Sequence, residues 1–198
     1  MSSSPPAGYP KTIRLKDGNT VLVRFMEQGD RDLLLEFFRG VPEEERMFLR
    51  EDITRPEVID TRVRAGERGR LVWLVGEAGG KIVADATLQR RLTNWLQHVA
   101  EVHVVVDSAY RRLGLAYRLL YELFDLAREQ GIETLLGEVM AEQEAVMSLL
   151  ERLGFRREAT LRGLVKDLQG RRHDLVIMTR DLTRKGETLL RWFSSPLD

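Results

Sequence analysis

One segment of the chain, residues 99–130, constrains its fold more than any other. It begins with the run Val99–Val106, whose end is almost continuously apolar, as expected for a strand in the centre of a sheet. The short segment RRLGLA follows from Arg111, and a long helix is predicted over residues 113–130. The apolar side chains of this helix recur at helical spacing and form one stripe: Ala116, Leu119, Leu120, Leu123, Phe124 and Ala127. The segment therefore predicts a strand, a short loop and a helix that packs back on the sheet.

Strand and helix patterns continue on both sides of this segment. Apolar and polar residues alternate over residues 12–25, and Asp17-Gly18 is a turn signal between the two halves. Asp30 is predicted to cap a helix, and Pro42 to open a second, short one. Further strands are predicted over residues 71–77, 81–89, 134–139, 155–161 and 173–181, and further helices over residues 56–68 and 143–152. This order is typical of a mixed α/β or α+β fold with one β-α-β-α segment at its centre.

The chain is predicted to contain one domain and two short ends. Residues 1–11 are expected to form a flexible N-terminal tail, residues 12–182 the domain, and residues 183–198 a C-terminal extension. No internal repeat or interdomain linker is visible. The extension carries an apolar group that needs a covering surface, either this core or that of a partner in a homodimer: Leu189, Leu190, Trp192 and Phe193.

Charge and cysteine content argue against several classes of function. With 31 Lys+Arg and 31 Asp+Glu, the chain lacks the basic excess that general nucleic-acid binding requires. It has no cysteine, which excludes disulfides and cysteine nucleophiles, and its three histidines are not spaced as metal ligands, so no metal is expected. No apolar run approaches the roughly 18–20 residues that span a bilayer, and the first residues lack a signal-peptide pattern. We therefore expect a cytoplasmic protein without a membrane partner.

The loop between the central strand and its helix has the features of an anion site. The first amides of a helix have no partner within the helix, and the helix dipole adds partial positive charge there. Gly114 and Ala116 are small enough for a phosphate to approach the backbone, and Arg111 and Arg112 add charge. A plain strand-to-helix turn with two surface arginines would have the same sequence, so the loop alone leaves both interpretations open.

The pattern Arg111-x-x-Gly114-x-Ala116 resembles the acyl-CoA pyrophosphate loop of the GNAT superfamily of N-acetyltransferases. The resemblance extends over residues 20–182. It is closest at GEVMAEQEAVMSLLERLGF, residues 137–155, which is similar to the GNAT domains of bacterial protein-lysine acetyltransferases and to related small-molecule enzymes. It implies the acyl-CoA N-acyltransferase fold, a mixed sheet of about seven strands that is flanked by helices and splits near the fourth and fifth strands.

The resemblance also implies where acetyl-CoA binds. The pantetheine would pair with backbone groups of Val104, Val105 and Val106. Relatives often carry Asn in the turn before the next helix, where this chain has Gln143, and many carry a tyrosine general acid where it has Leu150. The pyrophosphate would lie on the loop and helix start, which comprise Arg111, Arg112, Leu113, Gly114, Leu115, Ala116 and the nearby Tyr117.

Glu101 occupies the place of the glutamate base in the resembling family. Transfer to an amine needs a base, because only about one alkylamine in a thousand is neutral at pH 7. The alternative is a strand-edge carboxylate that orders a loop or pairs with an arginine. His103 shares its sheet face and could relay a proton, contact the acceptor or simply be a hydrogen-bonded, half-buried histidine. Glu138, on the neighbouring strand, is a second carboxylate that could reach the cleft, and we expect it to have a structural or acceptor-binding role rather than to be the base.

The predicted function is transfer of an acetyl group from acetyl-CoA to a primary amine, which releases CoA. Since no cysteinyl acyl-enzyme can form, we expect direct attack of the amine on the thioester. A protein lysine is the first expectation for the acceptor, and a small-molecule amine or amino acid the second. A non-catalytic acyl-CoA-binding sensor is the alternative from another class of function.

Overall fold

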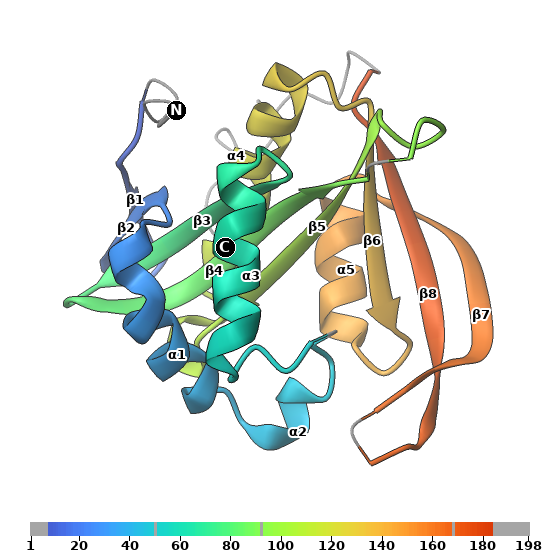
Figure 1. Ribbon diagram of the computed structural model, residues 1–198, viewed down its shortest axis with the longest axis horizontal. Coiled ribbons are helices and arrows are strands. Elements are labelled where there is room, and N and C mark those ends of the chain that lie inside the picture. Colours follow the sequence, from blue (N-terminus) through green and yellow to red (C-terminus); the bar gives the residue numbers. More distant parts are fainter. Residues whose placement is uncertain (1–7, 50, 92, 168, 184–198) are drawn as a thin grey trace.

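Eight strands form one mixed sheet in the order β1-β2-β3-β4-β5-β6-β8-β7 (Figure 1). The computed structural model describes residues 8–49, 51–91, 93–167 and 169–183. The strands are β1 (Lys11–Arg14), β2 (Thr20–Phe25), β3 (Leu71–Ala78), β4 (Lys81–Arg90), β5 (Val99–Val106), β6 (Thr134–Met140), β7 (Arg156–Lys166) and β8 (Arg172–Asp181). Within the described residues this is one strand more than the expected number of about seven, because both arms of the first hairpin join the sheet.

Helices cover both faces of the sheet (Figure 1). They are α1 (Arg31–Gly40), α2 (Glu43–Arg46), α3 (Pro56–Glu67), α4 (Leu115–Glu129) and α5 (Glu144–Arg152), with short 3-10 turns η1 (Gln28–Asp30) and η2 (Ser108–Tyr110). α4 packs on β4 and β5, and α5 lies against β6. α1 and α3 pack together on β4 and β3. Among the described residues, every helix is too short or too polar to cross a membrane.

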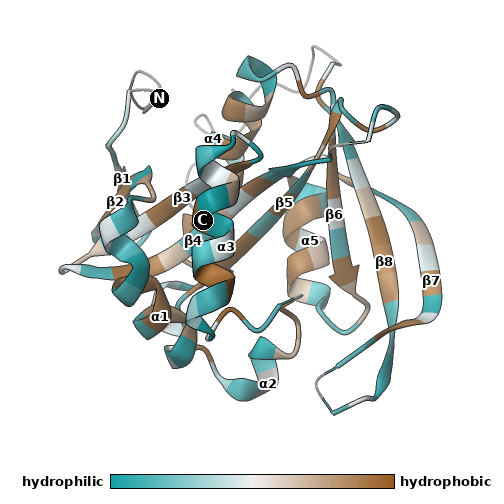
Figure 2. Cartoon of the chain, in the orientation of Figure 1, coloured by the Kyte–Doolittle hydropathy of each residue, from teal (hydrophilic) through white to brown (hydrophobic). Residues whose placement is uncertain are grey.

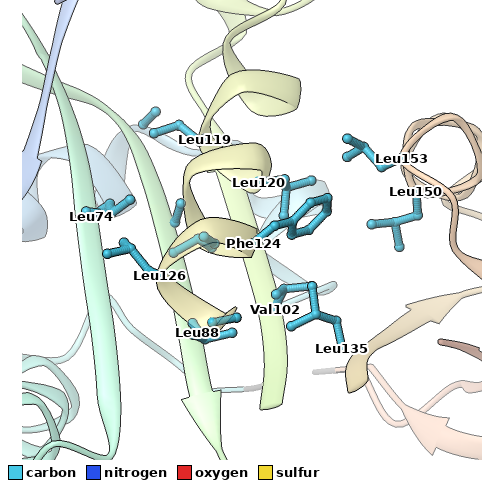
Figure 3. Packing of buried hydrophobic residues seen from close by; sticks show 14 of the residues in the cluster. Leu74, Leu88, Val102, Leu119, Leu120, Phe124, Leu126, Leu135, Leu150 and Leu153 are labelled. Atoms are coloured by element: carbon cyan, nitrogen blue, oxygen red, sulfur yellow. The ribbon is translucent and has the colours of Figure 1, made fainter. Parts of the chain in front are cut away.

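The predicted stripe of α4 forms the centre of the larger core. Five of its six members, Leu119, Leu120, Leu123, Phe124 and Ala127, are completely or almost completely buried. Figure 3 shows Leu120 and Phe124 on the side of α4 that faces Leu150 of α5 and Leu153, which follows α5. Ala116 differs, because it is only half-buried and lines a cavity instead. The helical spacing of the apolar residues thus predicted the helix and its buried face correctly, except at Ala116 in the first turn.

A second core lies under α1 and α3 and contains the apolar face of α1, whose hydropathy is visible in Figure 2. Asp30 stands at the N-cap position of α1, but its side chain makes no capping hydrogen bond. Its carboxylate instead accepts hydrogen bonds from Arg24 at 2.6 and 2.8 Å and from the backbone N–H of Glu27 at 2.8 Å. The predicted cap is therefore wrong in detail, because the partly buried Arg24 guanidinium binds the Asp30 carboxylate instead.

Two residues of the predicted N-terminal tail, Tyr9 and Lys11, contact the rest of the described structure. The Tyr9 hydroxyl donates a 2.7 Å hydrogen bond to Glu122 of α4, and its ring packs edge-on against Phe25. Lys11 begins β1 and forms an ion pair with the same glutamate. The predicted extension, with its apolar group at residues 189–193, lies outside the described residues apart from Thr183.

Candidate active site

A cavity of about 940 Å³ opens where β5 and β6 separate. The two strands pair in parallel only over Val99–Glu101, opposite Thr134–Leu136. Beyond this point, among the described strands, β5 pairs only with β4, and β6 only with β8. The separation leaves one backbone edge of each strand facing a gap. A cavity of this size suits a cofactor or substrate of moderate size.

The predicted pantetheine segment lies on the wall of this cavity. Val104, Val105 and Val106 all line it, and the edge of β5 that faces the gap offers backbone N–H and C=O groups, apart from the Val106 carbonyl, which accepts a hydrogen bond from Nε of Arg111. A strand that has lost one neighbour can form backbone hydrogen bonds with an extended ligand, much as it would with another strand. This arrangement fits an amide-containing chain such as pantetheine.

The loop at the start of α4 presents backbone amides to the same cavity. Arg112 has φ 59° and Gly114 φ 90°, so two left-handed residues flank Leu113 and shape a tight turn. Gly114 is the N-cap of α4 and makes no side-chain capping hydrogen bond. The first amides of the helix therefore lie at a cavity wall that Gly114, Leu115 and Ala116 help to form. The concave turn followed by a helix start suits a phosphate group.

Two of the predicted cofactor residues are placed differently from their neighbours. Arg111 lines the cavity, but its guanidinium forms a bidentate ion pair with Glu45 of α2, and its Nε donates to the Val106 carbonyl at 3.0 Å. The hydrogen bonds of this pair raise the pKa of Arg111 and lower the pKa of Glu45. Leu113 packs on the larger core, and its carbonyl accepts a hydrogen bond from the Lys16 N–H. Arg112 and Tyr117 line the cavity as expected.

A polar cluster lies where β5 and β6 begin to separate. Nη2 of Arg91 donates to Oε2 of Glu101 at 3.1 Å and to Oε1 of Glu138 at 3.0 Å. The other oxygen of Glu101 lies 3.1 Å from Nε2 of His103. His103 and Glu138 line the cavity, whereas Glu101 is 4% exposed and stands behind them. The structure thus brings the three groups singled out in the sequence together and adds an arginine that the sequence analysis did not identify.

The two positions that depart from the family pattern also lie at the cavity. Gln143 is the N-cap of α5, and its Oε1 accepts a hydrogen bond from the Met140 N–H at 3.1 Å. Leu150 is buried between the cavity and the core, where an added Cβ on Gly137 would lie 3.0 Å from its Cδ1. An apolar side chain at this position cannot donate a proton.

Residues 41–49 complete the cavity and were not predicted to do so. Val41, Glu45, Phe48 and Leu49 line it from the segment that contains α2. Their local pattern is that of a short, partly solvated helix, and nothing in it indicates a ligand site. Glu142, before α5, is a further lining residue that the sequence analysis did not select. Trp95 is 88% exposed in the loop after β4. Within the described ranges, no group of three or more His, Asp or Glu side chains has a metal-binding arrangement.

His173 links the cavity wall to the hairpin of β7 and β8. Its Nδ1 lies 2.8 Å from Glu142, and its Nε2 lies 3.0 Å from the buried Asp167 before β8. The hydrogen bond with Glu142, followed by that with Asp167, raises the pKa of His173 above its usual value near 6.5. Burial raises the pKa of Asp167, but hydrogen bonds from His173 and Arg171 outweigh this effect and lower it overall.

This link predicts a pH-dependent contribution to stability. Because the folded-state pKa of His173 is raised, its contribution is complete below pH 6.5 and is lost as the pH rises through the folded-state value. His173→Gln should therefore destabilise the protein more at pH 5.5 than at pH 9. Urea unfolding of both proteins at the two pH values measures this difference. An equal loss of stability at both values would contradict the assignment.

Comparison with known proteins connects this geometry to a family. The family model described as acetyltransferase (GNAT) family matches residues 31–155. The chain is 40% identical over 76 residues to the [ribosomal protein bS18]-alanine N-acetyltransferase of Escherichia coli K12, which is 38% of this chain and 51% of that relative. The matches thus span about half the length of such curated relatives.

Solved structures agree over a longer part of the chain. A ribosomal-protein-alanine N-acetyltransferase from Brucella melitensis aligns with a TM-score of 0.73 and 27% identity, covering 81% of this chain and 99% of that one. A Salmonella typhimurium protein solved with its cofactor acetyl-CoA has a TM-score of 0.74 at 22% identity, covering 86% and 98%, and so supports the fold alone. Because the family model covers well over half of the residues, this chain belongs to the GNAT family of acetyltransferases.

Proposed function

We propose that this protein transfers an acetyl group from acetyl-CoA to the amino group of a polypeptide. The observation that carries the proposal is that one cavity joins three features: the unpaired edge of β5, the amide-rich start of α4 and the polar cluster around Glu101. The first two suit the pantetheine and the pyrophosphate, and the third suits a proton acceptor. When bound, acetyl-CoA supplies the thioester and the CoA leaving group.

The residues of the chain divide the work between binding and proton transfer. Amides of the α4 start would hold the pyrophosphate, with Arg112 nearby, and backbone groups at Val104 would orient and polarise the carbonyl. The cluster around Glu101 would take the proton from the amine. Leu150 has no proton to donate, so we infer that the leaving sulfur is protonated from elsewhere.

For the acceptor we propose a lysine side chain, with an N-terminal α-amine as the alternative. The choice of lysine rests on the resemblance of residues 137–155 to the GNAT domains of bacterial protein-lysine acetyltransferases. The α-amine is favoured by the relatives named as ribosomal-protein-alanine N-acetyltransferases. The two differ chemically, because an α-amine has an ordinary pKa near 8 and a lysine near 10.4, so the lysine depends more on a base.

Acetyl-CoA should raise the melting temperature of the purified protein. A ligand at about 100 times its Kd stabilises by about 2.7 kcal/mol, which for a domain of this size corresponds to about 5–11 °C. Differential scanning fluorimetry with acetyl-CoA, and with adenosine alone as a control, measures the shift. No shift at millimolar acetyl-CoA would overturn the proposed function.

Two peptides separate the acceptors. One has a free N-terminal alanine and no lysine, and the other has a blocked N-terminus and one internal lysine. Release of CoA with the lysine peptide supports the first choice, and release with the alanine peptide alone supports the alternative. Binding of acetyl-CoA without turnover of any peptide or small-amine panel would instead favour the sensor.

A further inference from the structure

We propose that Nδ1 of His103 is the atom that takes the proton from the acceptor amine, and that Glu101 is a positioning residue that holds the imidazole. This inference rests on the proposed function and deepens it. It differs from the expectation that Glu101 itself is the base. Four observations on the polar cluster carry it.

The first observation is the environment of Glu101. Its side chain is 5% exposed, and each carboxylate oxygen already has a partner, Arg91 on Oε2 and His103 on Oε1. His103 and Glu138 line the cavity, whereas Glu101 is not among the described residues that line it. An amine in the cavity would therefore meet the imidazole before the Glu101 carboxylate.

The second observation concerns the protonation state of the ring. An ionised carboxylate can only accept hydrogen bonds, so the contact between Nε2 and Glu101 assigns the proton of neutral His103 to Nε2. Nδ1 then carries the lone pair. Within the described part of the chain, no hydrogen bond to Nδ1 of His103 is formed. The His103 side chain is 29% exposed and lines the cavity, so part of the imidazole is accessible from it.

The third observation is the charge of the surroundings. Glu101 and Glu138 share one guanidinium nitrogen of Arg91, so these three groups carry a net charge of −1 when both carboxylates are ionised. Asp85 of β4 also interacts electrostatically with His103. Burial raises the pKa of Asp85, which favours its neutral carboxyl form. A proton that arrives on His103 would therefore lie beside the Glu101 carboxylate and near the Asp85 carboxyl group.

The fourth observation weighs Glu138 as the alternative base. Glu138 lines the cavity with a side chain 21% exposed, and Arg91 binds it at 3.0 Å. Histidine is the side chain that most often serves in general acid–base catalysis, so the imidazole is the better candidate.

The step balances as a simple proton transfer followed by acyl transfer. One ammonium proton moves to Nδ1 of His103, while the Nε2–H bond to Glu101 is kept. The freed electron pair of the amine forms the C–N bond, and the C–S bond breaks. The second amine proton neutralises the thiolate, and the imidazolium returns its proton to solvent. The role of Glu101 matches that of the carboxylate that orients the histidine in hydrolase triads.

The experiment compares His103→Gln and Glu101→Gln with His98→Gln as a histidine control outside the cavity lining. The pH dependence of kcat/KM is measured with the peptide that supports turnover. We expect His103→Gln to lose about 10²–10⁴-fold and the ascending limb that the imidazole provides. Glu101→Gln should keep more activity than His103→Gln, because the imidazole is retained and only its orienting carboxylate is lost. His98→Gln should stay within about threefold of wild type.

A second measurement needs no acceptor. Long-range ¹H–¹⁵N spectra of the imidazoles should show neutral His103 with its proton on Nε2 in the wild type, and a tautomer mixture in Glu101→Gln. The melting temperature of each variant without ligand shows whether the variant folds, and the rise in melting temperature with acetyl-CoA shows whether it binds the cofactor. If His103→Gln does not fold, His103→Asn replaces it.

The results separate the inference from the proposed function. If His103→Gln keeps nearly full activity, or if His103 carries its proton on Nδ1 in the wild type, the inference is wrong. If Glu101→Gln alone abolishes turnover, Glu101 is the base, as first expected. Failure of the wild type to bind acetyl-CoA would instead contradict the proposed function and leave the tautomer assignment testable by the spectra.

Discussion

Phe124→Ala should lower the free energy of unfolding by about 3–5 kcal/mol, since it would leave a large cavity in the main core. Phe124 is completely buried on α4, between the rings of Tyr121 and Phe155, whose centroids each lie 6.0 Å away. The guanidinium of Arg180 lies 4.7 Å from the ring centroid on the sheet side. Removing the ring therefore removes contacts that join α4 to β8 and to the segment after α5. Figure 3 shows Phe124 on α4 among other buried side chains.

Urea unfolding measures this loss, and the melting temperature should fall by about 6–20 °C for a domain of this size. Trp95→Ala is a matched aromatic control, because its side chain is 88% exposed and its loss should change stability by about 0.5 kcal/mol or less. If the two variants had equal stability, the central position of Phe124 in the core would be refuted.

Gly114→Val should weaken acetyl-CoA binding about 10–100-fold. Gly114 has φ 90° at the start of α4, a conformation that a β-branched residue adopts only at a cost of about 1–3 kcal/mol. An added Cβ would meet no atom within 4 Å, so steric contact with the rest of the protein does not explain the effect. The strain would instead turn the loop and move the helix-start amides away from the pyrophosphate.

Gly114→Asn is the matched control, because asparagine tolerates the left-handed region. In isothermal titration calorimetry, the affinity of Gly114→Asn for acetyl-CoA should lie within about threefold of wild type, and the affinity of Gly114→Val should be well below that of wild type. Equal weakening by both substitutions would point to the side chain filling the site rather than to backbone conformation. Unchanged binding by Gly114→Val would remove this loop from the predicted cofactor site.

The unit of strand, loop and helix could be predicted because its signals are local. Residues 99–106 read as a buried strand, and the stripe of α4 repeats at helical spacing. The structure contains both, and Gly114 between them has φ 90°. By contrast, the side-chain contacts of Asp30 and Arg111 depend on partners outside their own elements, Arg24 and Glu45, and local patterns carry no record of them.

The residues that surround the candidate base show the same limit. The sequence placed Glu101 and His103 on one face, because alternate residues of a strand share a face. It did not show that Arg91 joins Glu101 to Glu138, because Arg91 and Glu138 stand 47 residues apart and meet only through the sheet order β4-β5-β6. It also did not show that Glu101 lies behind His103, which depends on where the two strands separate.

By itself, the sequence determined the mixed fold class, the buried face of α4 and the loop that precedes it, because periodicity and backbone conformation depend on neighbouring residues. Only the tertiary structure decided which side chains share the cavity, that Arg111 pairs with Glu45, and that His103 rather than Glu101 lies on the cavity wall. These contacts join residues far apart in the chain, and the register and separation of the strands decide whether such residues meet.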